Sequence, residues 1–174
     1  MTNAQTNLGV GPAAQGSSLL GHGALAGIIG GLAIAATGMG LSAIRGAGFW
    51  SLPNGIGGIV SGPAAGATRD FGAITVTGVL LHMALSAIFG VATLFAVRRL
   101  TREYLWTGIA SGLALWLFNY YFIGLFVPGA HALAELNPVW IGGGLHLLFG
   151  AVFGIAAKQL DRPAQQATAA AAGH

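Results

Sequence analysis

Two histidines that stand in a repeated sequence pattern have the clearest capacity for chemistry in this chain. The segment HMALSAIFGVA at 82–92 and the segment HLLFGAVFGIA at 146–156 are identical at five of eleven positions. Small residues recur at intervals of four around His82 and His146, namely Gly78, Ser86, Gly90, Gly142, Gly150 and Gly154. Because residues four apart share one face of a helix, each segment is predicted to be a helix with a histidine on a small-residue face that packs closely against other helices.

The histidine pair allows several kinds of ligand binding. His82 and His146 could supply both axial ligands of a b-type haem, with the glycines making room for the macrocycle. Together with His131 or Glu135 they could bind a metal such as copper or zinc, and they could also hydrogen-bond a quinone. Ionisable residues inside a membrane are functional candidates by default, so the ligand interpretation stays open.

A structural role for the same histidines is the competing interpretation. A neutral imidazole can satisfy a carbonyl or hydroxyl across a helix interface and so help to hold two helices together. A haem needs two helices that face each other across a gap, whereas a stripe of glycines favours direct backbone contact. The pattern therefore favours the structural interpretation over the haem site.

Other polar residues carry weaker signals. Asn119, in the predicted third span, could hydrogen-bond toward the histidines, but an interhelical amide contact is the simpler interpretation. Glu135 precedes Asn137-Pro138, which is typical of a helix start, so we expect no catalytic role for it. The chain has no cysteines, which excludes disulfides, covalent c-type haem and thiolate chemistry. Motifs for phosphate binding or hydrolysis are also missing, so no catalytic residues and no enzymatic activity are expected.

The elements that must position these residues are predicted to be membrane-spanning helices. Only 6% of the residues are charged and 55% are hydrophobic, with a mean hydropathy of +0.75. A span needs ~20 apolar residues, and the charge-free stretches predict four of them. They lie at about 18–43, 73–97, 104–127 and 139–157. The expected fold class is therefore an all-α, polytopic membrane protein with the lipid bilayer as its main partner.

The flanking segments complete the predicted organisation. The domain is expected to cover 18–160, and the polar, small-residue segments 1–17 and 161–174 are expected to be disordered. The apolar part of segment 45–72 is too short to span, and either an interfacial or a re-entrant position fits it.

The distribution of basic residues predicts the orientation of the spans. One side holds five of them, Arg98, Arg99, Arg102, Lys158 and Arg162, whereas the other side holds only Arg45 and Arg69. The positive-inside rule places the first group, and both termini, in the cytoplasm. The same rule explains the net charge of +3 without a nucleic-acid partner. His82 and His146 then lie at similar depth in the outer half of the membrane, and His22 lies near the cytoplasmic face.

Several apolar stretches together resemble a known group of proteins. They are GFWSLPNGIGGIV, GVLLHMALSAIFGV, LWTGIASGLALWLFNYYF and, after a proline-containing loop, LHLLFGAVFGI. Over about residues 20–157 the chain resembles a group of small bacterial four-helix inner-membrane proteins of unknown function, which are distantly similar to the YagU-like proteins. This resemblance implies a multi-pass protein of the bacterial inner membrane and carries over no activity.

The expected function is non-enzymatic. The small size, the lack of catalytic groups and the glycine-rich helix faces favour an accessory or structural subunit of a larger membrane complex, such as a respiratory or other electron-transfer assembly. Other membrane protein subunits are then its expected partners. The alternatives are a haem or metal binder that uses His82 and His146, and a small channel or carrier, which would need a polar pore that the sequence does not display.

Overall fold

The computed structural model describes residues 12–172, with side chains described for residues 18–162, and this part of the chain contains helices and turns but no strand. Four helices are long: α1 (Pro12–Ile44), α4 (Ala73–Ala96), α5 (Tyr104–Leu117) and α8 (Val139–Ala172). Four are short: α2 (Ser51–Ser61), α3 (Pro63–Gly66), α6 (Gly124–Phe126) and α7 (Pro128–Glu135). Two π-helical turns, η1 (Val97–Thr101) and η2 (Phe118–Ile123), extend α4 and α5.

Four continuous helical stretches are long and apolar enough to cross a membrane, which confirms the predicted all-α, four-span fold. They are Ser18–Ile44, Ala73–Thr101, Tyr104–Phe126 and Val139–Arg162. The first long helix begins earlier in the sequence than expected, at Pro12 of α1, and the last ends later, at Ala172 of α8. Proline is favourable at the first helical position, and the alanine-rich tail propagates a helix that is already formed. Segments 12–17 and 161–172, expected to be disordered, are therefore helical.

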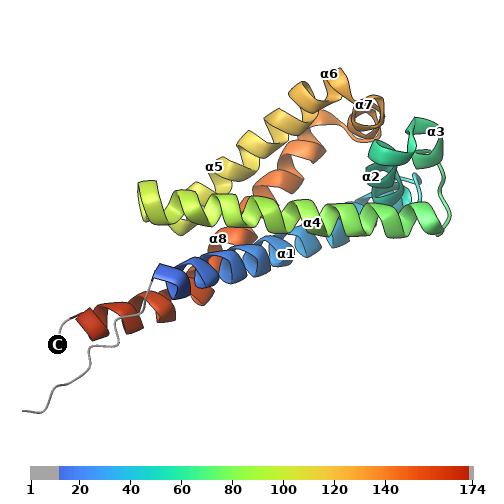
Figure 1. Cartoon of the computed structure of the whole chain (residues 1–174). Helices are drawn as coiled ribbons and strands as arrows, with labels where there is room; N and C mark the ends of the chain where they lie inside the picture. The colour runs from blue at the N-terminus through green and yellow to red at the C-terminus, as the bar shows by residue number, and fades with distance from the viewer. Residues whose placement is uncertain (1–11, 173–174) are drawn as a thin grey trace, which may run out of the picture.

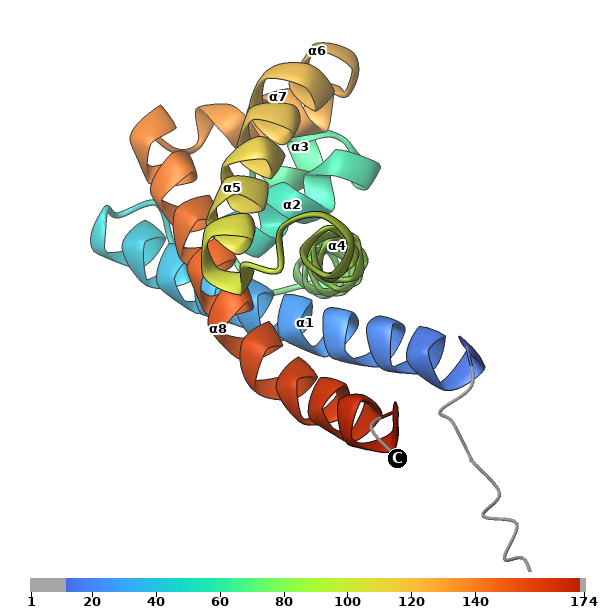
Figure 2. The same ribbon diagram turned by 90° about the vertical axis from the view of Figure 1, so that its left-hand side faces the viewer.

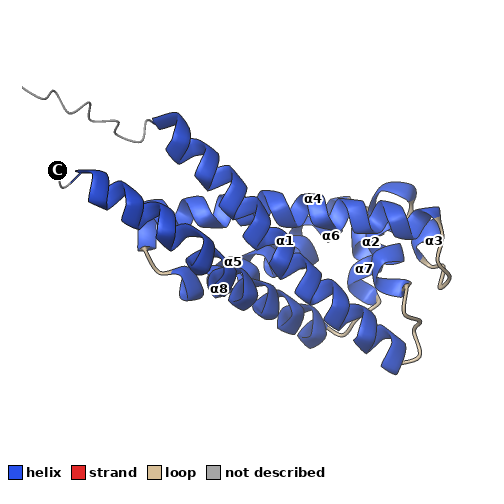
Figure 3. Cartoon of the chain, turned by 90° about the horizontal axis from the view of Figure 1, so that it is seen from below, coloured by secondary structure: helices blue, strands red, loops and turns tan. Residues whose placement is uncertain are grey.

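The long helices pack as two antiparallel pairs that are joined through α1. Helix α1 packs against α4 and also against α8, and α5 packs against α8, whereas α4 and α5 touch little. Figure 1 shows α4 and α5 meeting at their connecting turn and then diverging. Figure 2 looks along α4 and shows α1 and α5 on two sides of it. The first turns of α1 and the last turns of α8 extend from the bundle at the same end, as Figures 1 and 3 both show.

Glycines form the contact surfaces within both helix pairs. In the α1–α4 pair, a Cβ added to Gly27 would collide with the carbonyl oxygen of Ser86, and one on Gly90 would collide with that of Gly23. In the α5–α8 pair, Gly108 and Gly150 each lie against the carbonyl oxygen of the other. Such close backbone approach drives helix association in lipid, where hydrophobicity gives little advantage.

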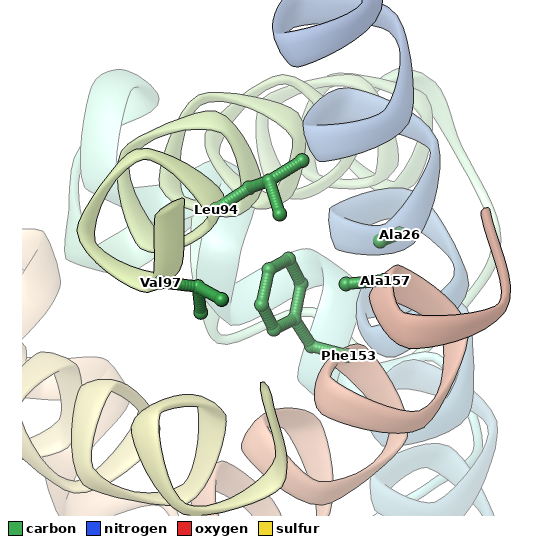
Figure 4. Close-up of a cluster of buried hydrophobic side chains, with 5 residues drawn as sticks. All are labelled: Ala26, Leu94, Val97, Phe153 and Ala157. Carbon is green, nitrogen blue, oxygen red and sulfur yellow. The ribbon is translucent and has the colours of Figure 1, made fainter. Parts of the chain in front are cut away.

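A cluster of buried apolar side chains joins three of the long helices near the end that holds the termini. It consists of Ala26 of α1, Leu94 of α4, Val97 of η1 and the pair Phe153 and Ala157 of α8 (Figure 4). The ring of Phe153 lies between the other four side chains and is fully buried. This cluster fixes the crossing of α1 and α8.

The short helices form a cap at the opposite end of the bundle, away from the ends of α1 and α8 (Figure 1). Helix α2 lies beside the first turns of α4, where a Cβ on Gly78 would collide with the carbonyl oxygen of Pro53. Helix α7 packs on α2 with Gly129 against the carbonyl oxygen of Gly58. Segment 45–72 is thus an ordered part of the bundle.

Candidate functional site

His82 links α4 to α1 by a hydrogen bond. Its Nε2 lies 2.9 Å from the carbonyl oxygen of Gly31, and because that oxygen can only accept, Nε2 carries the proton and donates it. Position 31 has room only for a glycine, because a Cβ there would overlap the side chain of Ser86. The close glycine contact is what brings the imidazole within reach of the α1 backbone.

His146 occupies a comparable place in the other helix pair but bonds differently. Its Nδ1 lies 2.8 Å from the carbonyl oxygen of Gly142, one turn earlier in the same helix, and donates to it. The backbone of His146 faces α5, because a Cβ on Gly112 would collide with its carbonyl oxygen. The repeated sequence pattern thus serves two separate helix pairs.

The three histidines expected to bind a metal together do not form one group. His131 lies on the exposed side of α7, where its Nε2 is 3.3 Å from the Glu135 carboxylate one turn later. Among the described side chains, no three His, Asp or Glu residues are grouped so that they could hold a metal ion. The expected set of His82, His146 and His131 is therefore not assembled, because the cap holds His131 at its surface.

The six small residues singled out in the sequence divide between two kinds of contact. Ser86 and Gly90 lie against α1, and Gly150 and Gly154 lie against α5. The other two make different contacts: Gly78 lies against the short helix α2, and Gly142 lies against a side chain of α5, the indole of Trp116, instead of its backbone.

Asn119 lies half-buried in η2. Within the described part of the chain, its side chain makes no hydrogen bond to either His82 or His146. The next residue, Tyr120, instead ties η2 to the cap, since its hydroxyl donates to the carbonyl oxygen of Ala134 at 3.0 Å. The neighbourhood of Asn119 therefore connects the third span to α7.

A buried carboxylate that sequence reasoning missed joins all four spans at the end that holds the termini. Asp161 of α8 is fully buried and accepts hydrogen bonds from Nε of Arg98 at 3.1 and 3.2 Å, one to each oxygen, as well as from Nη2. The hydroxyl of Tyr104, the first residue of α5, donates to it at 2.7 Å. His22 Nδ1 of α1 lies 3.4 Å away, and Arg98 also donates to Ser18 Oγ at 3.2 Å. We call Ser18, His22, Arg98, Tyr104 and Asp161 the polar clasp.

The sequence does not predict the polar clasp, because membrane topology alone accounts for its charges. Arg98 fits a cytoplasmic anchor, and Asp161 begins the segment 161–174 that is expected to be disordered. A signal was present, since Asp161 is an acidic residue within a group of basic residues at one membrane face. A buried charge is tolerated when it is paired and hydrogen-bonded, and Asp161 meets both conditions.

A second buried polar group organises the cap. The amide of Asn54 is fully buried and its Nδ2 donates to the carbonyl oxygens of Thr68 at 2.8 Å and Asp70 at 3.0 Å. Its Oδ1 accepts from the hydroxyl of Thr75 at 2.6 Å, and that hydroxyl accepts from the backbone N–H of Gly72 at 3.0 Å. Asn54 thereby holds the loop 67–72, which we call the return loop, against α2 and the start of α4.

An apolar groove lies where α4 and α5 diverge. Its volume is about 310 Å³, and it is lined by Phe89, Ala92, Thr93, Ala96, Ser111, Ala114, Leu115, Phe118 and Phe149. Neither His82 nor His146 is among these lining residues. The groove and the histidines are therefore separate features.

No family model matches the chain, and neither a curated protein nor a solved structure matches it. The resemblance to YagU-like proteins therefore stays a prediction. Within the described part of the chain, polar side chains bond to one another or to backbone carbonyls and tie helices together.

Proposed function

We propose that the protein is a non-catalytic subunit of a larger membrane assembly and that α5 docks against its partner. The exposure of the third span carries this proposal. Only 6% of the residues in its apolar part are buried within the protein, compared with 22% to 28% in the other three spans. The third span is thus the one that the rest of the chain covers least.

The uncovered side of α5 has the composition of a packing surface. Exposed residues recur along it and into the following turn, namely Trp106, Ala110, Leu113 and Leu117 of α5 and Tyr121 of η2. We call this set the α5 stripe. It lies on the side of α5 opposite Gly108 and Gly112, which contact α8. Four bulky side chains around one alanine give a neighbouring helix ridges and a hollow to fit, and shape is what drives helix association in lipid.

We place this assembly in the bacterial inner membrane, with both termini in the cytoplasm, and take a respiratory or other electron-transfer complex as the class of host to test first. The basic end of the bundle supports the orientation. The alternative of a haem held by His82 and His146 has less support, because glycine contacts close both helix pairs and each imidazole already bonds a carbonyl. A channel has less support too, because the cluster between the polar clasp and the cap is apolar.

Site-specific photo-crosslinking in intact membranes tests the proposal. A photoreactive amino acid is placed at Trp106, Leu113 or Leu117 of the α5 stripe. Matched controls carry it at Leu32 of α1 and Leu80 of α4, which are similarly exposed. We expect crosslinks to one distinct membrane protein from the α5 positions and only lipid adducts from the controls, with the partner then identified by mass spectrometry after gentle detergent extraction.

Two results would contradict the subunit role. Lipid adducts alone at all five positions would leave α5 without a protein partner. Crosslinks only between copies of this chain would instead indicate a homo-oligomer that works by itself.

A further inference from the structure

The groove between α4 and α5 is apolar, and a residue of α8 completes its lining. The two helices share the turn at η1 but touch little beyond it, and Figure 1 shows them diverging from that turn. Phe149 of α8 lies at the groove together with residues of both walls. Because neither wall helix closes against the other, an apolar space of about 310 Å³ stays open between them.

The walls of the groove fit a hydrocarbon chain. Three alanines, Ala92, Ala96 and Ala114, leave room along the walls, and aromatic rings bound the space at Phe89, Phe118 and Phe149. From Ala96 to Phe89 the wall runs ~10 Å along α4, at 1.5 Å per residue. One leaflet contributes about half of a ~30 Å hydrocarbon core, so the groove covers much of the depth of one leaflet.

Two exposed arginines lie at the turn that follows the α4 wall of the groove. Arg99 comes three residues after Ala96, and Arg102 directly follows η1. The guanidinium of Arg99 lies 5.8 Å from the centre of the Phe95 ring. The neighbouring Arg98 is engaged by Asp161 in the polar clasp, and the exposed Glu103 is the acidic residue next to this pair. The turn therefore presents two cations beside one carboxylate.

We propose that one anionic phospholipid binds here, with an acyl chain in the α4–α5 groove and its phosphate at Arg99 and Arg102. Arginine pairs with phosphate through parallel N–H···O hydrogen bonds, and basic residues at a membrane surface attract anionic lipids. The apolar groove and the two cations lie in the order that a phospholipid presents, chain toward the membrane centre and headgroup at its surface. This site is distinct from the α5 stripe and does not depend on the subunit role.

Native mass spectrometry of the full chain, purified in detergent and stripped of lipid, tests the site. Phosphatidylglycerol and phosphatidylcholine with the same acyl chains are added in turn. We expect one phosphatidylglycerol to bind more tightly than phosphatidylcholine. The double variant Arg99→Gln/Arg102→Gln should bind it roughly 30-fold more weakly, since each basic residue near the surface contributes ~1 kcal/mol.

Matched variants separate this site from general charge attraction. Lys158→Gln/Arg162→Gln removes two positive charges from the same end of the bundle but on α8, and should leave the affinity within about twofold. Ala92→Phe fills the groove and should weaken both lipids, whereas Ala84→Phe, at an exposed position of α4 outside the groove, should not. Equal weakening by the two charge variants, or unchanged binding in Ala92→Phe, would overturn the proposal. So would a wild-type dimer that Ala92→Phe converts to monomer, because a second copy would then occupy the groove.

Discussion

At the scale of single residues, the polar side chains of this protein act as connectors between helices. Asp161 accepts from η1 and α5 and lies beside α1. His82 joins α4 to α1, and Asn54 joins α2 to the return loop. Each connector is buried or half-buried, where a lost partner leaves an unsatisfied group that costs more than the bond contributes. Substitutions at these residues should therefore affect stability before anything else.

Asp161→Asn should lower the free energy of unfolding by about 3 kcal/mol, because removing one partner of a buried ion pair leaves the other charge uncompensated. Arg98 is 19% exposed, so water offsets part of the loss. Unfolding by a denaturing detergent, followed by circular dichroism, measures the change. The exposed neighbour variant Arg162→Gln should stay within about 0.5 kcal/mol of the wild type. An equally small effect of Asp161→Asn would show that the polar clasp does not stabilise the fold.

His82→Leu should cost about 1 kcal/mol, since an interhelical hydrogen bond in lipid is lost. His146→Leu should cost less, because its bond runs to Gly142 within the same helix and the Gly142 carbonyl keeps its backbone partner. The same unfolding measurement compares the two. An absorption spectrum of the reduced protein tests the alternative. A haem band that the wild type shows and both variants lose would contradict the structural role and show that the histidines bind haem.

At the scale of elements, glycine spacing determines which helices pair. The repeated pattern around His82 and His146 correctly indicated helices with small-residue faces, since Gly90 and Gly150 lie against other backbones. It did not indicate that Gly78 would contact α2, because nothing in the spacing distinguishes a long partner helix from a short one. The cap was unpredictable for a similar reason: Asn54 bonds to Thr68 and Asp70, and only the folded loop brings these groups together.

Gly108→Ala should destabilise the α5–α8 pair by about 1 to 3 kcal/mol, because the new methyl group would overlap the Gly150 backbone and force the helices apart. Gly144→Ala in α8 is the matched control, since nothing lies near the position where its Cβ would be. That variant should be neutral or stabilising by up to about 1 kcal/mol, because alanine favours a helix more than glycine does. Similar unfolding energies for the two variants would argue against direct backbone contact in this pair.

At the scale of the whole molecule, the four spans and the all-α fold followed from charge-free stretches long enough to cross a bilayer. The arrangement of these spans did not, because it depends on which glycine faces meet and on Asp161, whose partners come from three other helices. The start of α1 and the end of α8 lie at the same end of the bundle (Figure 3). The orientation of that end in the membrane is a prediction that the chain makes easy to test, because it has no cysteines of its own.

Single cysteines at exposed positions should report the orientation. Ala64→Cys in the cap should react with a membrane-impermeant maleimide in intact cells, whereas Thr101→Cys at the basic end should react only after the cells are lysed. This result follows from the excess of basic residues on the cytoplasmic side. Labelling in the reverse order would place the cap in the cytoplasm.

The polar clasp also has a consequence for biosynthesis. Arg98 and Asp161 are 63 residues apart in the chain, so the ribosome adds the carboxylate roughly 3 to 13 s after the guanidinium, at 5–20 residues per second. Until then the first two spans can be inserted and paired, but Arg98 lacks its principal acceptor. Closure of the clasp therefore waits for the fourth span, and a nascent chain released before residue 161 lacks the carboxylate that Arg98 pairs with in the folded protein.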